Sequence, residues 1–240
     1  MISLVYKEVN AFFNNIIGYL ILTVFLVAMG MVVWVFPDTS VLEYGFADLE
    51  ALFVYTPYVF AFLVPAITMR MIAEEKKTGT WELLMTSPLK PHQLVLAKYF
   101  AGLLVLTFSL VPSLLYYFSV YQLGAPIGNI DSAGFFGSFF GIIMIGAVFT
   151  GIGLFSSSLT DNQITAFVLG VFLCFVFYFG FMGLISLFDT SQWAVLIEQV
   201  SLSYHYENLS RGVIDSGDLY FFITWIVVMI VFTTLMVRRK

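Results

Sequence analysis

Six long apolar runs, separated by short polar segments, dominate the pattern of residues along the chain. A membrane-crossing helix needs about 20 mostly apolar residues, and each run is close to that length. The runs are continuous and do not alternate every second residue, which excludes the strands of a membrane β-barrel. The pattern predicts an all-α membrane protein, a six-transmembrane-helix bundle. The predicted spans are about 16–36, 52–72, 94–117, 135–156, 165–187 and 219–237.

The residues before the first span have a different pattern. Apolar residues recur there near helical spacing, with polar residues between them, which predicts an amphipathic helix over residues 1–15 lying in the membrane interface. The alternative is that this segment simply extends the first span. The first apolar run has no small-residue cleavage site, so we expect it to stay in the membrane rather than act as a signal peptide. The whole chain, 1–240, is predicted to form one transmembrane domain.

Composition restricts the class of protein further. Apolar residues make up 60% of the chain and charged residues only 10%, whereas soluble domains have about 25% charged residues. The mean hydropathy is +0.97. These values exclude an ordinary soluble enzyme, a nucleic-acid-binding domain and a secreted disulfide scaffold. The one cysteine, Cys174, lies in an apolar run and is expected to be a packing residue.

The distribution of Lys and Arg predicts the orientation. Nine of the ten basic residues fall in the N-terminal segment, between spans two and three, or at the C-terminus, and only Arg211 falls on the other side. Basic residues accumulate on the cytoplasmic side of membrane proteins. We therefore expect a multi-pass protein of the bacterial inner membrane with both termini in the cytoplasm.

Candidate catalytic and metal-binding groups are sparse. No charged residue or histidine lies near the middle of a predicted span, which argues against a proton- or sodium-driven pump. His92 and His205 lie in segments on opposite sides, and each is expected to face solvent. The sequence has no HExxH, GxSxG or GxxxxGK[ST] motif. We expect no enzymatic activity, cofactor or metal, so active transport would draw its energy from a partner.

Small residues and prolines indicate how the helices pack. Gly137 and Gly141 form a GxxxG motif in span four, which favours close helix packing, within the subunit rather than between subunits. Prolines are predicted to kink spans two and three: Pro57, Pro65 and Pro112. Between spans five and six, the apolar residues of the segment 193–202 predict a short helix in the outer interface.

The segment between spans two and three is the most informative. Charged helix-forming residues extend span two to Lys77, and Gly79 then allows a break. Thr80 is predicted to cap a new short helix, with Glu82 near its positive end. The apolar residues of that helix need burial, either in the lipid head groups or in a groove on another protein. They are Trp81, Leu83, Leu84 and Met85.

The same segment resembles a known family. Residues 74–88 (EEKKTGTWELLMTSP), followed by 94–99 (LVLAKY), are similar to the conserved loop of ABC-2 type transporter permeases, and 206–215 (YENLSRGVID) also resembles that family. More narrowly, the chain resembles the gliding-motility-associated permease subunit of bacterial ABC transporters.

The resemblance implies an interfacial elbow helix at residues 1–15 and a cytoplasmic coupling helix at about 78–85. It also implies a separate ABC ATPase subunit and a second permease subunit, either a second copy or a related auxiliary chain. The coupling role is expected of Glu74, Glu75, Thr78, Gly79, Thr80, Trp81, Glu82, Leu83 and Leu84. Two alternatives stay open: an exporter of this type for another substrate, and a mechanical or signalling element that moves no solute.

Overall fold

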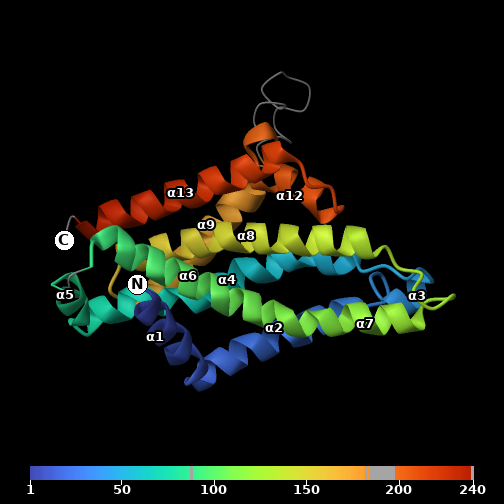
Figure 1. The fold of residues 1–240 in the computed structure, drawn as a ribbon, viewed down its shortest axis with the longest axis horizontal. Helices are drawn as coiled ribbons and strands as arrows, with labels where there is room; N and C mark the ends of the chain where they lie inside the picture. Colours follow the sequence, from blue (N-terminus) through green and yellow to red (C-terminus); the bar gives the residue numbers. More distant parts are fainter. Residues whose placement is uncertain (87–88, 182, 184–197, 239–240) are drawn as a thin grey trace.

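The computed structural model describes residues 1–86, 89–181, 183 and 198–238. These residues form helices and the turns between them, with no strand. The long helices lie side by side along one axis (Figure 1). Short helices accompany them, among them α1 (Ile2–Phe13), α3 (Val41–Tyr44), α5 (Thr80–Met85) and α12 (Leu202–Ser210).

The prediction of an all-α bundle with six spans is confirmed. Within the described residues, six helical segments are long and apolar enough to cross a membrane. They are α2 (Ile16–Trp34), α4 (Glu50–Lys77), α6 to α7 (Pro91–Leu123), α8 (Ser132–Leu159), α9 to η2 (Gln163–Gly180) and α13 (Ser216–Arg238). The observed α4 and α8 are longer than predicted because polar residues extend the apolar runs at their ends.

The third and fifth spans depart from regular helix. The third consists of α6 (Pro91–Leu110), a 3-10 turn η1 (Val111–Ser113) and α7 (Leu114–Leu123). The interruption lies at Pro112, as expected of a residue that removes a backbone donor. The fifth consists of α9 (Gln163–Phe175) and a π-helical turn, η2 (Val176–Gly180). The predicted end of this span, 184–187, and most of the predicted outer helix, 193–197, lie outside the described residues.

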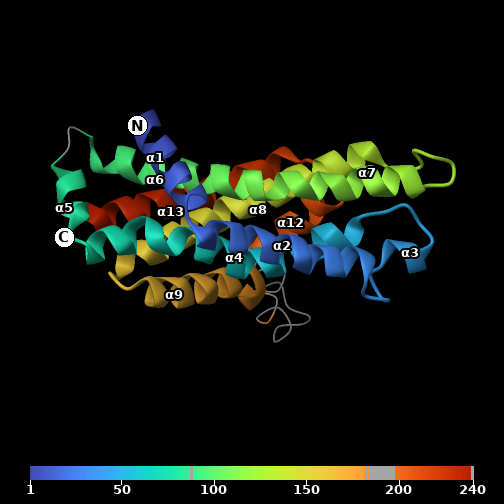
Figure 2. The same cartoon turned by 90° about the horizontal axis from the view of Figure 1, so that it is seen from below.

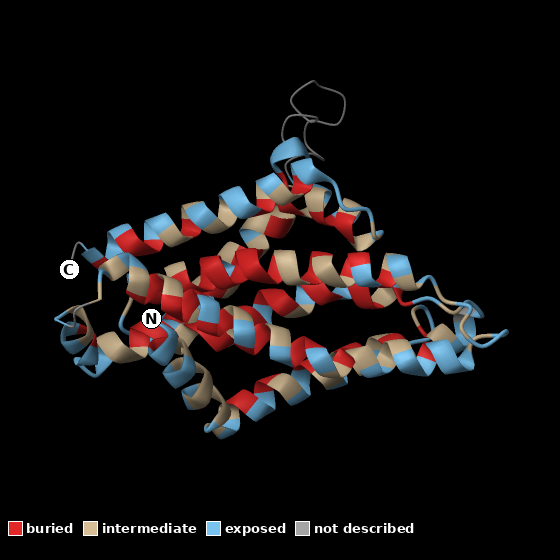
Figure 3. Cartoon of the chain, viewed as in Figure 1, coloured by how far each residue is buried: buried red, intermediate tan, exposed pale blue. Residues whose placement is uncertain are grey.

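The buried core runs along α4, α6 and α8, at the centre of the bundle (Figure 3). In the most apolar stretch of each span, 72% of the residues of α8 are buried, against 22% in the segment formed by α9 and η2. Large side chains without exposed surface fill the centre, including Phe25, Phe60 and Phe149. Helices α2, α9 and α13 therefore form the outside, where their apolar faces are available to lipid or to another chain.

Glycines in α8 allow α12 and the turn that follows it to approach the α8 backbone closely. A Cβ atom on Gly137 would lie 2.7 Å from the carbonyl oxygen of Gly212, and one on Gly141 would lie 2.8 Å from Leu209 Cβ. Both distances are too short for a side chain. The packing predicted for this motif is therefore confirmed, and it is within the subunit.

Helix α1 lies at a steep angle to α2 (Figures 1 and 2). The Asn15 side chain caps α2 by accepting a hydrogen bond from the amide of Ile17 at 3.0 Å. A Cβ atom on Gly18 would lie 2.5 Å from the Phe12 carbonyl oxygen. The sharp corner between the two helices thus depends on a glycine, and α1 does not continue the first span.

Helix α12 supplies a hydrogen-bond donor that α4 lacks. Pro57 has no amide hydrogen, so the carbonyl oxygen of Phe53, four residues earlier, lacks its helical donor. The Tyr206 hydroxyl donates a hydrogen bond to that oxygen at 2.6 Å. Burial raises the pKa of the Tyr206 hydroxyl well above its ordinary value, so the group remains a donor.

Replacing Tyr206 by Phe should destabilise the protein by about 1–2 kcal/mol, because the buried Phe53 carbonyl loses its donor. In a Pro57→Ala background, the restored amide supplies that donor, so the same Tyr206→Phe change should cost much less. Equilibrium unfolding of the four variants in mixed micelles measures the coupling. Equal costs in both backgrounds would contradict this account.

Candidate functional site

The corner between α4 and α5 is closed by its own polar groups. The amide and the hydroxyl of Thr78 both donate to the carbonyl oxygen of Glu74, each at 2.9 Å. The Thr78 and Thr80 hydroxyl oxygens are 3.0 Å apart. Gly79 adopts the left-handed conformation with φ 71°, which favours glycine. Gly79 itself occupies the N-cap position, so the prediction that Thr80 caps this helix is wrong by one residue.

One face of α5 is attached to the bundle. Trp81 is only 6% exposed and belongs to the main core. Leu84 and Met85 are half-buried against Leu4 of α1 and Leu94 of α6. These side chains find their burial inside the chain itself.

The other face of α5 is open. Glu82 is exposed, and the Leu83 side chain is also outside, with 71% of the residue exposed. Thr78, Gly79 and Thr80 are exposed as well. Because Trp81 holds α5 against the core, the exposed Glu82 and Leu83 have a fixed position. Together they form an outward surface at this end of the bundle.

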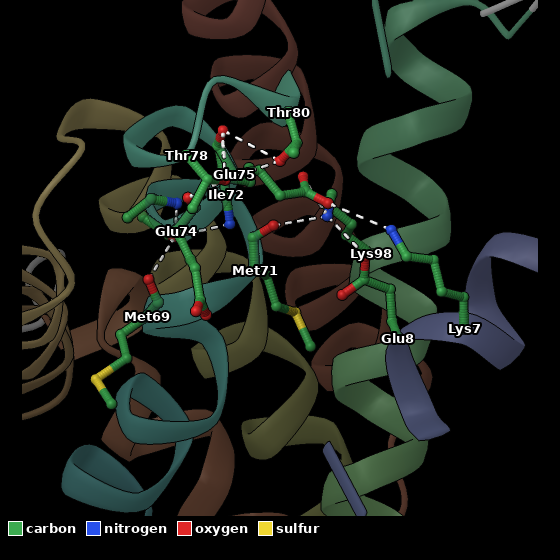
Figure 4. Close-up of polar contacts among 12 residues, drawn as sticks. Lys7, Glu8, Met69, Met71, Ile72, Glu74, Glu75, Thr78, Thr80 and Lys98 are labelled. Carbon is green, nitrogen blue, oxygen red and sulfur yellow. Dashed lines mark hydrogen bonds and ion pairs between the residues drawn. The ribbon is translucent and has the colours of Figure 1, made fainter. Parts of the chain in front are cut away.

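A buried lysine joins three helices next to this corner (Figure 4). Lys98 of α6 has no exposed surface. Its Nζ lies 2.7 Å from Glu75 Oε2 on α4 and 2.8 Å from Glu8 Oε1 on α1, and it donates to the Met71 carbonyl oxygen at 2.6 Å. Both carboxylates are largely buried, with side-chain exposures of 14% and 13%. We call these three side chains the Lys98 cluster.

A second set of hydrogen bonds ties the end of α4 to the end of α8. The Ser157 hydroxyl accepts from the amides of Ile72 and Ala73 at 3.2 and 3.1 Å and donates to the Met69 carbonyl oxygen at 3.0 Å. Lys76 Nζ donates to the carbonyl oxygen of Ser158. Because α5 follows directly from α4, it is linked through these bonds and the Lys98 cluster to α1, α6 and α8.

The structure divides the nine predicted coupling residues into groups. Glu75 belongs to the Lys98 cluster, and Trp81 belongs to the core. The corner residues and the outward face of α5 stay at the surface. The residues at or near the surface are Glu74, Thr78, Gly79, Thr80, Glu82, Leu83 and Leu84, of which Glu74 and Leu84 are half-buried.

Sequence reasoning missed the roles of Lys98 and Glu8. A signal was present, because a lysine within an apolar run needs a counter-charge if it is buried. The sequence could not show that its partners are 23 and 90 positions away. Only the packing of three helices brings them together.

The prediction for His205 is wrong. His205 Nδ1 lies 2.5 Å from Asp218 Oδ1, and its ring stacks on Phe221 with a centroid distance of 3.9 Å. Its side chain is only 14% exposed. Helix α12 packs against the start of α13, and this covers the imidazole. His92 is exposed, as predicted.

Replacing Lys98 by Met should destabilise the protein by about 3 kcal/mol, because two buried carboxylates lose their shared counter-charge. Lys77→Met, at an exposed position on α4, should change stability by less than about 0.5 kcal/mol. Adding Glu75→Gln to Lys98→Met should recover part of the loss. Unfolding in mixed micelles measures all three, and equal stabilities of the two methionine variants would refute the role given to the cluster.

Comparison with known proteins places the chain. The family model described as ABC-2 family transporter protein matches residues 37–237. The match covers α3 to α13 and most of the site, while α1 and α2 precede it. No curated protein matches the chain. The family implies an ABC ATPase as partner. The chain thus belongs to the ABC-2 transporter family and is a membrane-spanning permease component.

Proposed function

We propose that this chain is the permease subunit of an ATP-driven ABC-2 transporter and that α5 docks on a separate ATPase subunit. The observation that carries the proposal is the two-sided arrangement of α5. Trp81 fixes one face in the core, while Glu82 and Leu83 are exposed on the other. An exposed leucine in a polar surrounding fits a protein groove better than water.

The connections behind α5 support a coupling role. Force applied to α5 passes into α4, which is held to α1 and α6 by the Lys98 cluster and to α8 by Ser157. Glu75 serves that link, and Glu74, Thr78, Gly79 and Thr80 shape the corner. Glu82 and Leu83 form the docking surface with the ATPase, and the half-buried Leu84 holds that surface against α1 and α6.

The charge distribution supports a cytoplasmic position of α5. The start of α1, the α4–α5 corner and the end of α13 lie at the same end of the bundle (Figures 1 and 2). The segments with most of the basic residues meet there, and basic residues favour the cytoplasmic side. The protein then spans the bacterial inner membrane with both termini in the cytoplasm. Helix α1 is the interfacial elbow helix.

A second permease subunit is part of the proposal. Large side chains fill the centre of the described bundle, which leaves the space between two chains as the path for a substrate. The partner is a second copy or a related auxiliary chain.

In the narrower form suggested by the gliding-motility resemblance, the complex supports gliding. The same apolar filling also favours a second candidate, a mechanical element that moves no solute; ATP-driven solute movement in reconstituted liposomes would exclude it.

Glu82→Lys and Gly79→Pro should each reduce the ATPase activity that co-purifies with the tagged chain by about tenfold or more. Charge reversal disrupts the docking face, and proline cannot adopt the φ of 71° found at Gly79. Glu43→Lys is the matched control, because Glu43 is also exposed on a short helix, α3, at the opposite end of the bundle. Unchanged ATPase recovery with both test variants would refute docking at α5.

Orientation can be tested with introduced cysteines, because the natural Cys174 is fully buried. Thr86→Cys, after α5, should resist a membrane-impermeant thiol reagent in intact cells and react after permeabilisation. Phe46→Cys, exposed at the opposite end, should react in intact cells. The reverse pattern would place α5 outside and end the coupling proposal.

A further inference from the structure

A cavity of about 440 Å³ lies beneath α1, between α1, the first turns of α2 and the α5-proximal half of α4. This volume falls within the range of small-molecule sites, about 300–1,000 Å³. The polar side of the cavity adjoins the Lys98 cluster, which Figure 4 shows with Lys7 and Glu74 nearby. The docking face of α5, formed by Glu82 and Leu83, does not line it.

The cavity has two chemically distinct walls. Apolar residues of α1, α2 and α4 form one wall: Phe12, Ile17, Ile21 and Ile67. Charged residues form the other: Lys7, Glu8, Arg70, Glu74 and Glu75. A site of this kind suits a ligand with a charged head and an apolar tail.

Two cations on the polar wall have spare capacity for an anion. The buried Nε of Arg70 donates no hydrogen bond to any residue that the structure describes, and its closest recorded carboxylate oxygen, Glu74 Oε2, is 4.0 Å away. Lys7 Nζ lies 3.9 Å from Glu75 Oε1, on a carboxylate that Lys98 already holds at 2.7 Å. A buried donor without an acceptor is costly, and a phosphate oxygen is a strong acceptor for Arg.

The charges of this region balance. Glu8 and Glu75 share Lys98, and the remaining groups are the cations Lys7 and Arg70 and the carboxylate Glu74. The six groups together are neutral, so a purely anionic head group would add an uncompensated charge. A zwitterionic head can place its phosphate near Arg70 and Lys7 and its ammonium near Glu74.

The geometry points to a binding site for a zwitterionic phospholipid, such as phosphatidylethanolamine, between α1, α2 and α4. The phosphate binds Arg70 and Lys7, the ammonium group pairs with Glu74, and the acyl chains begin along Phe12, Ile17 and Ile21. The leaflet is the one at the α1 end of the bundle, where an amphipathic helix meets the head groups. A lipid in this position fills the angle between α1 and α4 and stabilises the elbow.

Native mass spectrometry of the delipidated full-length chain, titrated with dioleoylphosphatidylethanolamine, tests the proposal. The wild type should retain one lipid, and Arg70→Gln should bind it at least about tenfold more weakly. The matched control is Arg211→Gln, because Arg211 forms an exposed ion pair with Glu207 at the other end of the bundle. The control should bind lipid like the wild type.

A steric variant tests the same site without removing a charge. Ala66 lines the cavity from α4 and is half-buried, so Ala66→Phe should fill part of the space and also release the lipid. Size-exclusion elution and thermal unfolding identify a test variant that fails to fold. If either Arg70→Gln or Ala66→Phe does so, lipid retention by the remaining variant tests the site. Wild-type lipid retention by a folded test variant would overturn the assignment.

Two further ligands separate the parts of the proposal. Glycerophosphoethanolamine, which has the head group and no acyl chains, should compete poorly; if it displaces the lipid at equal concentration, the apolar wall has no role. Phosphatidylglycerol should bind more weakly than the zwitterionic lipid, and equal retention would overturn the charge argument. Because the chain is tested without an ATPase, a negative result leaves the proposed function unaffected.

Discussion

The shared ion pair of Lys98 is the interaction on which the arrangement of the α5 end depends. An ammonium group without exposed surface is very costly unless it is paired and hydrogen-bonded. Lys98 meets that condition only when α1 supplies Glu8 and α4 supplies Glu75 and the Met71 carbonyl. Three helices must therefore be in register at the same time. The position of α5 follows, since it continues from α4 and packs on the same helices.

The far end of α4 is fixed by a different device. Proline opens a carbonyl in α4, and a tyrosine from α12 closes it. Glycines in α8 then let α12 lie against the bundle. The central helix is thus held at both ends by groups from distant parts of the sequence. In the proposed coupling, movement of α5 would act on a helix that is already attached to most of the bundle, so the response would be collective rather than local.

A membrane environment explains why large apolar helix faces are exposed, which would be unfavourable in a soluble protein. The apolar faces of α2, α9 and α13 are exposed in the chain alone, which suits contact with lipid tails or a second subunit. Helix α1 packs on α6 at an angle to α2, and an amphipathic cavity lies between α1, α2 and α4. In the proposed complex, lipid fills that cavity while the ATPase contacts the other side of the α4–α5 corner.

The apolar runs alone determined the fold class and the six spans, because length and hydropathy are local properties that a bilayer reads directly. Gly79 predicted the break after α4, since its backbone freedom is also local. The partners of Lys98, the covering of His205 and the burial of Trp81 were decided only by the tertiary structure. Each depends on which helix faces meet, and neither the period of the apolar residues nor the spacing of charges encodes a contact between residues 8, 75 and 98.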